Sequence, residues 1–279
     1  MKKTLLFILL FICCLSLSAQ SFKIISYNIL EGMKMDTSQK KQKFVEWLKH
    51  QNPDILAIQE ANKFTEQSLS ELAKSYGHPY AVLVKESGYP TALTSKYPIE
   101  NIEKVNEGIT HGFIAAQIKG INIVVLHLNP HDYQRRRNEI KQITDKISKK
   151  FDKKNLLVMG DFNSFTPLEK EVFDNGVVLS NIKKAQQRSN GRHNNLINGE
   201  ELDFEVQQHL LDYDLVDVLK ELEKKDPKNA YNIIPQTYRI DYIYCSKDMI
   251  KKVKSGLFIR DYFTKKYSDH LPIAIEIKL

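Results

Sequence analysis

Short stretches of apolar residues recur along the chain and predict β-strands. Alternation of apolar and polar residues over 22–29 and again over 271–279 is typical of strands with one buried face. The apolar run at 156–159 and the segment 54–60, which ends in an acid, predict buried strands, and the segment 121–128 is strongly β-forming. Strands therefore occur throughout the chain, and the remaining ones are predicted near residues 81–84, 91–94, 113–118 and 238–244.

A second pattern, with apolar residues three and four positions apart, predicts helices between these strands. The first helix follows a capping segment at 36–38 and ends before Pro53. Further helices are predicted over 65–76, 133–151 and 210–222. Because strands and helices alternate, we expect an α/β fold.

Residues 176–208 show neither pattern. They are rich in Asn, Gln, Lys and Gly, and such a polar segment inside a domain is expected to be an irregular surface insertion. Its cations at 183–192 could contact a substrate, although a solvent-exposed loop is the more usual role. The chain has no internal repeat and no low-complexity linker, so residues 21–279 are predicted to form one domain.

The first twenty residues differ from the rest. Lys2 and Lys3 precede an apolar run at 5–15, and small residues follow as far as Ala19. This order is typical of a secretory signal peptide, so we expect residues 1–20 to be removed and the protein to be exported, to the periplasm or the medium. The run is shorter than the ~20 apolar residues that cross a bilayer, and no later run reaches that length. We therefore expect no integral membrane segment after signal removal.

Composition narrows the class of protein only slightly. The chain has 279 residues, 42% hydrophobic and 27% charged, as in an ordinary globular protein with a substantial core. Its formal charge is +7, or +5 without Lys2 and Lys3, which favours an anionic partner without selecting nucleic acid, phospholipid or polyphosphate. Only Cys245 lies outside the signal peptide, so no internal disulfide is expected. We expect a monomer.

Residues that can bind metal or move protons stand at the ends of the predicted strands or within them. Each one alone is most often a turn or capping residue, and Arg239 offers Asp241 a purely structural partner. Their repetition at strand ends is the stronger signal, because open α/β sheets bind ligands at that edge. The candidate set consists of Asn28, Glu60, His127, Asp161, Asn163, Asp241, Asp269 and His270.

The chain resembles the endonuclease/exonuclease/phosphatase superfamily in six motifs that follow one another in the family's order: Tyr-Asn, Gln-Glu, Leu-His-Leu, Gly-Asp-Phe-Asn, Arg-Ile-Asp-Tyr-Ile and Ser-Asp-His. The resemblance covers the chain from Ile25 to its end. It implies a DNase I-like fold, a four-layer α/β sandwich of two packed mixed β-sheets flanked by helices. It also implies a metal-dependent phosphoesterase whose site lies at one end of the two sheets.

The resemblance places Asn28, Glu60 and Asp269 at a metal site, with Glu60 as the principal carboxylate ligand. Oxygen ligands suit a hard divalent cation, so Mg²⁺ is expected, with Mn²⁺ or Ca²⁺ as alternatives. Such an ion neutralises charge that develops on phosphate and stabilises the leaving oxygen.

The resemblance gives the other five residues catalytic roles. Asp161 is expected to orient the attacking water and Asn163 to hold the phosphate. His270 corresponds to the family's essential histidine, and Asp241 is expected to fix its tautomer. His127 is expected to contact a phosphate oxygen or to assist the leaving group. Whether His270 or Asp161 is the base stays open.

These residues favour hydrolysis of a phosphodiester by direct attack of water, and the positive charge favours a nuclease. A phosphomonoesterase and a sphingomyelinase-like lipid phosphodiesterase of the same superfamily are alternatives. The second usually needs an exposed apolar loop to reach a membrane, whereas the insertion here is polar. The alternative from a different class is a catalytically silent binding module, because a fold does not determine a function.

Overall fold

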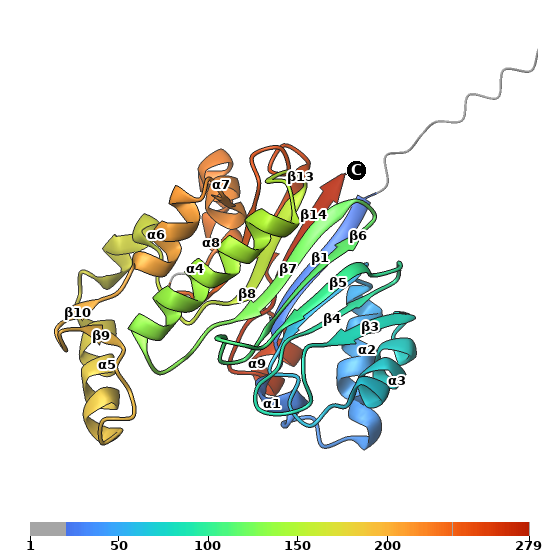
Figure 1. Cartoon of the computed structure of the whole chain (residues 1–279), viewed down its shortest axis with the longest axis horizontal. Helices are drawn as coiled ribbons and strands as arrows, with labels where there is room; N and C mark the ends of the chain where they lie inside the picture. The colour runs from blue at the N-terminus through green and yellow to red at the C-terminus, as the bar shows by residue number, and fades with distance from the viewer. Residues whose placement is uncertain (1–20, 236, 279) are drawn as a thin grey trace, which may run out of the picture.

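Two six-stranded sheets pack face to face in the computed structural model, which describes residues 21–235 and 237–278 (Figure 1). The predicted signal peptide, residues 1–20, lies outside the described residues. In spatial order the first sheet contains β13 (Val253–Phe258), β14 (Ile273–Lys278), β1 (Ser21–Asn28), β2 (Ile55–Gln59), β4 (Ala92–Ser95) and β3 (Tyr80–Leu83). The second sheet contains β11 (Val216–Asp217), β12 (Asp241–Cys245), β8 (Leu156–Asp161), β7 (Ile121–His127), β6 (Phe113–Ile118) and β5 (Glu100–Val105).

Helices cover the outer faces of both sheets, with the first group on one side in Figure 1 and the second on the other. The first sheet packs against α2 (Gln42–Gln51), α3 (Glu66–Ser75) and α9 (Tyr262–Tyr267). The second packs against α4 (Tyr133–Lys150) and α6 (Glu205–Asp212). Among the described residues no helix is both long and apolar enough to cross a membrane. The shorter elements are α1 (Leu30–Met33), α5 (Val177–Arg188), α7 (Val218–Lys225), α8 (Ala230–Ile233), β9 (Leu196–Ile197), β10 (Glu201–Leu202), η1 (Gln39–Lys41), η2 (Pro167–Phe173) and η3 (Pro227–Asn229).

Neighbouring residues of one strand serve different layers, because successive side chains of a strand point to opposite faces. In β1, Ile24 packs toward the second sheet in a cluster that contains Ile114 and Met159. Ile25, the next residue, packs on the outer side with Leu48 of α2. Burying side chains on both faces of each sheet produces the four-layer sandwich, which confirms the predicted fold class.

Both sheets are mixed. β1 and β2 run parallel, as do β7 and β8, and every other pair of neighbouring strands is antiparallel. The carboxyl ends of parallel neighbours lie at the same edge of a sheet. In each sheet, therefore, one parallel pair carries its C-terminal residues to a common edge.

The prediction of an irregular insertion at 176–208 was wrong. This segment contains α5, the β9–β10 ribbon and the start of α6. No residue of α5 is fully buried, and its apolar residues at helical spacing, the half-buried Val178, Leu179 and Ile182, lie in a segment whose composition is mostly polar. The segment is tied to the domain because the Asn195 amide donates to the Pro130 carbonyl at 2.9 Å and accepts from Arg136 at 2.7 Å.

Other boundaries also differ from the sequence-based expectation. The helix expected over 210–222 is two helices, α6 and α7, because Val216 and Asp217 pair with β12 as a short strand between them. Two edge strands, β5 and β13, were not predicted, since most of their residues are exposed and give no periodic apolar signal.

Candidate active site

The carboxyl ends of the two parallel pairs bring four of the predicted residues to one edge of the sandwich. Asn28 ends β1 opposite Gln59 of β2, and Glu60 follows directly. His127 ends β7 opposite Asp161, the last residue of β8. Because β1 and β2 pack against β7 and β8, both pairs end in the same place.

Gly160 explains the glycine of the Gly-Asp-Phe-Asn motif. Its φ is +145°, and a Cβ at this position would lie 1.9 Å from the carbonyl oxygen of Leu126 in β7. Only glycine therefore allows β8 to approach β7 this closely. The close approach places Asp161 beside His127.

Asp161 is the centre of the site. The Asn28 side-chain amide donates to Asp161 Oδ2 at 3.0 Å and to Glu60 Oε1 at 3.1 Å, so one amide joins two carboxylates from different sheets. The backbone N–H of Asn163 donates to Asp161 Oδ1 at 2.9 Å. Asp161 is 2% exposed, and these contacts fix its orientation.

Two imidazoles approach the same oxygen of Asp161. His127 Nε2 lies 3.6 Å and His270 Nε2 3.8 Å from Asp161 Oδ2, which is beyond ordinary hydrogen-bond distance. His270 Nδ1 hydrogen-bonds to Asp241 Oδ2 at 2.7 Å. This bond turns His270 Nε2 toward Asp161, the orientation expected if Asp241 positions the imidazole.

The charge state of His270 follows from its neighbours. Burial alone would lower its pKa, but the carboxylates of Asp241, Asp161 and Asp269 outweigh burial and raise the pKa to about 10. Burial raises the pKa of Asp241 to about 6, while His270 opposes that rise. We conclude that the ion pair, imidazolium with carboxylate, is the stable state of these two groups near neutral pH.

Glu60 is held by the loop that follows β1. Its Oε2 accepts from the Glu31 backbone N–H at 2.8 Å, and its own backbone is left-handed, with φ of +60°. In the same loop Gly32 has φ of +71°, and a Cβ there would lie 2.1 Å from the Asn62 carbonyl oxygen. Glu60 is half-buried, so its carboxylate can reach both the site and water.

Asp269 reaches this edge through the segment that precedes β14. The Ser268 hydroxyl donates to the Asn28 carbonyl oxygen at 2.8 Å and accepts from the His270 backbone N–H at 3.1 Å. In the sequence Asp269 lies between Ser268 and His270, and its side chain is exposed. Across residues 21–235 and 237–278, no hydrogen bond or ion pair joins its side chain to the other predicted residues.

The donor set fits a hard divalent ion. Glu60, Asn28 and Asp269 offer only oxygen ligands and amide groups, as Mg²⁺ prefers, and Glu60 and Asp269 stay accessible to water. Ligand atoms of Asp161, Asp241 and His270 also lie within 4.8 Å of one another. Because the Asp241 oxygen already bonds to His270, we interpret this second group as a hydrogen-bonded His270–Asp241 pair beside Asp161.

The position of Asn163 suits the expected contact with phosphate, whereas Arg239 does not bind the partner considered for it. Asn163 has φ of +48°, and its amide donates to the Leu128 carbonyl at 3.0 Å, which leaves one amide hydrogen for a ligand. Arg239 does not pair with Asp241. It forms ion pairs with Glu169 at 2.8 Å and with Asp217 at 2.5 Å, so the structural alternative for Asp241 was wrong.

Sequence reasoning missed two residues of this region, His111 and Glu139. His111 precedes β6, and its ring stacks on His127 with centroids 4.2 Å apart. Glu139 lies in the middle of α4 and accepts hydrogen bonds from the backbones of Thr110 and Asn129. Neither stands at the end of a predicted strand, so the pattern that revealed the other residues could not reveal them.

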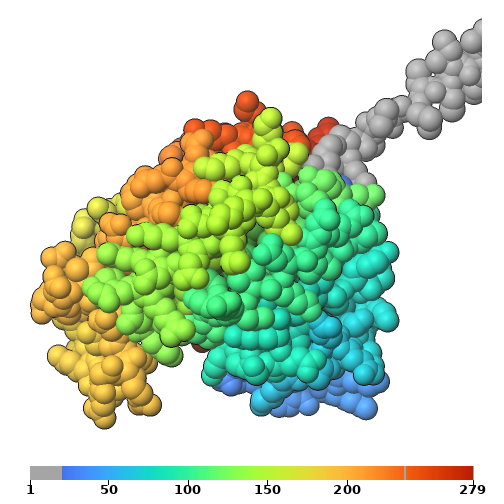
Figure 2. All heavy atoms as spheres, viewed as in Figure 1, coloured from blue at the N-terminus to red at the C-terminus, as the bar shows by residue number. Residues whose placement is uncertain are grey.

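The folded insertion borders the β7 side of the site. His193 stacks on His131 with centroids 4.4 Å apart, and the Asn194 backbone N–H donates to the His131 carbonyl at 2.6 Å. Figure 2 shows the yellow segment that contains α5 as a projection, separated by a hollow from the blue and teal part of the chain. The insertion therefore packs on the loop that follows β7.

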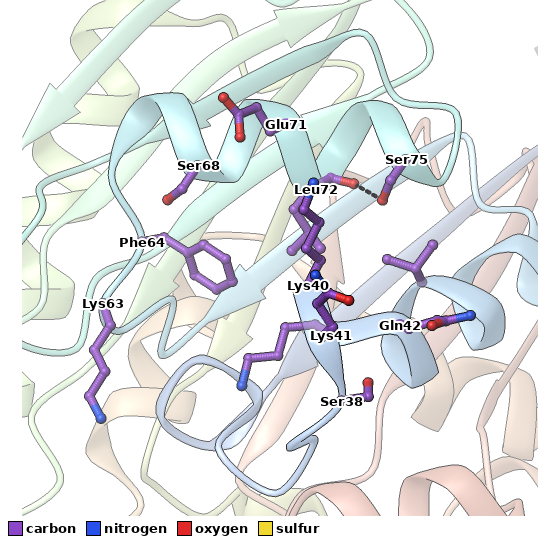
Figure 3. A pocket seen from close by; sticks show the side chains of 12 residues that line it. Ser38, Lys40, Lys41, Gln42, Lys63, Phe64, Ser68, Glu71, Leu72 and Ser75 are labelled. Carbon is purple, nitrogen blue, oxygen red and sulfur yellow. Dashed lines mark hydrogen bonds between the residues drawn. The ribbon is translucent and has the colours of Figure 1, made fainter.

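A pocket of about 710 Å³ lies elsewhere, between the start of α2 and α3 (Figure 3). Its lining combines the apolar side chains of Phe64 and Leu72 with Lys41 and Lys63. Lys41 already donates to the carbonyls of Met33 and Asp36. None of the eight predicted site residues lines this pocket.

Comparisons with known proteins agree with this architecture. A model of the Endonuclease/Exonuclease/phosphatase family matches residues 25–270. The fold resembles an AP endonuclease from Archaeoglobus fulgidus, with 18% identity, a TM-score of 0.64, and coverage of 92% of this chain and 100% of that one. It also resembles a 3′ phosphatase from Neisseria bound to a product DNA hairpin and a 3′-5′ exonuclease from Neisseria meningitidis. Both are 20% identical, cover 92% of this chain and 100% of their own, and have TM-scores of 0.63 and 0.62.

Proposed function

The chain belongs to the endonuclease/exonuclease/phosphatase family, and from this membership we propose that it is an exported, Mg²⁺-dependent phosphodiester hydrolase acting by direct attack of water. Members of this family are hydrolases of phosphate-ester bonds that generally require a divalent metal. The metal ion, the class of ester and the export are our proposals. Export is supported only by the signal-peptide pattern of residues 1–20.

The observation that carries the proposal is the position of Asp161 between Asn28, His127 and His270. An ionised carboxylate with fixed orientation can accept a hydrogen bond from water and direct its lone pair at phosphorus. The 3.6 and 3.8 Å separations leave both imidazole Nε2 atoms without a close partner on Asp161. Each Nε2 can therefore donate to a phosphoryl oxygen that enters beside Asp161.

The remaining groups hold the substrate and prepare it for attack. His270 carries positive charge because Asp241 holds its Nδ1 proton, so its Nε2–H opposes the negative charge of the phosphoryl oxygens. The free amide hydrogen of Asn163 can bind a further oxygen. When bound by Glu60, Asn28 and Asp269, a divalent ion supplies charge neutralisation at the phosphate and the leaving oxygen. No covalent nucleophile is required.

Nucleic acid is the substrate that we favour. The formal charge of +7, or +5 without the two lysines of the predicted signal peptide, supports binding to a phosphate backbone. On the β7 side of the site, Arg135 lies near His111 and Arg192 near His131. The similar structures named above include a DNA-bound phosphatase and two nucleases by their descriptions. The 3′ phosphatase supports a phosphomonoester as the second candidate substrate.

The test compares hydrolysis of plasmid DNA, RNA, bis-p-nitrophenyl phosphate, p-nitrophenyl phosphate and sphingomyelin by the purified protein. We expect Mg²⁺-dependent activity on a diester that is abolished by EDTA and by Asp161→Asn. The matched control is Asp152→Asn, because Asp152 is exposed and lies outside the site. A folded protein that hydrolyses neither diester nor monoester with Mg²⁺, Mn²⁺ or Ca²⁺ would contradict the proposal and favour the binding module.

A further inference from the structure

His111 forms a buried stack with His127 that the mechanism above does not use. The ring centroids are 4.2 Å apart with an interplanar angle of 26°, and the two side chains are 8% and 2% exposed. The ring of Tyr89, from the loop between β3 and β4, meets His111 edge-on at 5.6 Å. His111 thus lies between the site histidine and an exposed aromatic ring.

Both stacked histidines contain a nitrogen atom without a partner. His111 Nε2 and His127 Nδ1 are buried, and neither has a hydrogen-bond partner within the described part of the chain. Leaving a buried polar atom unpaired costs folding free energy, so native proteins rarely do so without a reason. His78 provides the contrast, because its buried ring hydrogen-bonds at 2.8 Å to both Thr94 and Pro53.

The backbone beside the stack is fixed by hydrogen bonds. Glu139 of α4 is 0% exposed and accepts from the backbone N–H of Thr110 and of Asn129, both at 2.8 Å. Lys85 donates to the Thr110 carbonyl oxygen at 2.9 Å. Thr110 directly precedes His111, so these bonds hold the backbone at the base of the His111 side chain. A side chain on a backbone fixed in this way is prepared to bind a ligand.

The surroundings of His111 favour an anionic ligand that accepts a hydrogen bond. Burial, together with the nearby His127, Lys85, His131 and Arg135, lowers the pKa of His111 to about 2. The ring is therefore neutral and keeps one N–H donor, while the surrounding cations attract negative charge. An oxygen of a phosphate group meets both conditions.

We propose that His111 is a further substrate-binding residue whose Nε2–H donates to a phosphate-ester oxygen beside His127. This inference rests on the proposed function, because the substrate must enter at Asp161 to reach the stack. In this interpretation the two stacked histidines bind the substrate by hydrogen bonds and do not serve packing alone.

The test replaces His111 by Phe, which keeps an aromatic ring in the stack and removes both nitrogens. We expect kcat/KM on the best diester to fall roughly 10- to 100-fold, the loss of one hydrogen bond to a charged group. We also expect the melting temperature to stay the same or rise, because an unpaired buried nitrogen is gone. His111→Gln, which keeps a donor, should recover part of kcat/KM.

His78→Phe is the matched control. It removes a buried histidine with both nitrogens bonded, so the melting temperature should fall while kcat/KM of the folded protein stays at the wild-type value. If His111→Phe behaves like His78→Phe, or keeps wild-type kcat/KM, His111 is structural and the inference is wrong. Should His111→Phe fail to fold, His111→Leu, which also removes both nitrogens, decides by the same two measurements.

A binding measurement separates this inference from the proposed function. Inorganic phosphate with Mg²⁺ should raise the melting temperature of the wild-type protein and should do so less for His111→Phe. A wild-type protein that hydrolyses no ester but shows this difference would contradict the proposed function and support the phosphate contact. Equal stabilisation of the two proteins by phosphate would contradict the contact, whatever the activity.

Discussion

The two sheets bring different chemistry to their common edge. The first supplies Glu60 and Asp269, which are half-buried and exposed. The second supplies His127, Asp161 and Asp241, which are 2%, 2% and 7% exposed. A hard cation retains water among its ligands, so its carboxylates must stay accessible, whereas groups that direct a proton act best where water cannot compete. The difference in burial therefore matches the division of roles that we propose.

Hydrogen bonds between predicted site residues join the sheets at this edge. Asn28 of the first sheet donates to Asp161 of the second, and His270, which precedes β14 of the first sheet, bonds to Asp241 of the second. Neither sheet holds a complete site. The packing of the apolar cluster between the sheets is thus a condition for assembling the catalytic groups, and variants at these contacts test the comparison.

The largest effect is expected for Asp161→Asn. The amide keeps the shape of the side chain but cannot accept a proton or carry negative charge, so kcat should fall on the order of 10⁴-fold. Binding of inorganic phosphate should change little, because removing a negative charge does not weaken an anion contact. Steady-state kinetics and a phosphate titration measure the two quantities. A loss confined to KM would show that Asp161 binds substrate and does not direct water.

A smaller loss, roughly 10²-fold in kcat, is expected for Asp241→Asn. The amide can no longer stabilise the His270 imidazolium, so the pKa of His270 should drop and its Nε2 should lose a fixed orientation. A double-mutant cycle with His270→Ala measures the coupling. If Asp241 acts through His270, the double variant should be as active as His270→Ala alone. Additive losses would show independent roles.

Glu60→Gln should act on the metal requirement and leave the second sheet unchanged. A neutral amide binds Mg²⁺ more weakly than a carboxylate, so the Mg²⁺ concentration that gives half-maximal activity should rise at least 10- to 100-fold. Saturating metal should restore much of kcat. Titration of activity with Mg²⁺ is the measurement, and the variant at Asp161 should show no such rescue. An unchanged Mg²⁺ titration would remove Glu60 from the metal site.

The sequence predicted most of this edge because strand ends are visible in a hydrophobic pattern. Residues that directly follow or end an apolar run, such as Glu60 and Asp161, are placed by the strand itself. The pattern could not predict the contacts between the sheets. The Asn28–Asp161 hydrogen bond, for example, joins residues that are 133 positions apart in the sequence. Periodicity describes each strand and contains no information on which sheet faces it.

The missed features have physical reasons as well. His111 and Glu139 are placed by loop and helix contacts that leave no local pattern. The helix α5 was missed because its short apolar face lies within the polar segment 176–208, whose composition resembles that of a loop. Arg239 was given the wrong partner, since the nearest acid in sequence is Asp241 whereas the guanidinium bonds Glu169 and Asp217. Tertiary contacts decided each of these cases.

The smallest effect concerns the pH dependence of stability. It compares His78, whose buried ring hydrogen-bonds to neutral groups, with His270, which is paired with carboxylates at the site. Burial lowers the pKa of His78 to about 4. Between pH 4 and 6.5 the His78 ring therefore stays neutral in the folded protein, whereas in the unfolded chain it binds a proton below about pH 6.5. His78 thus stabilises the fold fully above pH 6.5, and this contribution is lost as the pH falls toward 4. His270 has the opposite sign, because its raised pKa contributes stability below pH 6.5 that is lost as the pH rises through 10. Denaturant unfolding of the wild type and His78→Gln between pH 4 and 8 should therefore show the largest difference at the upper end. A difference that grows toward pH 4 would mean that His78 is protonated in the native protein.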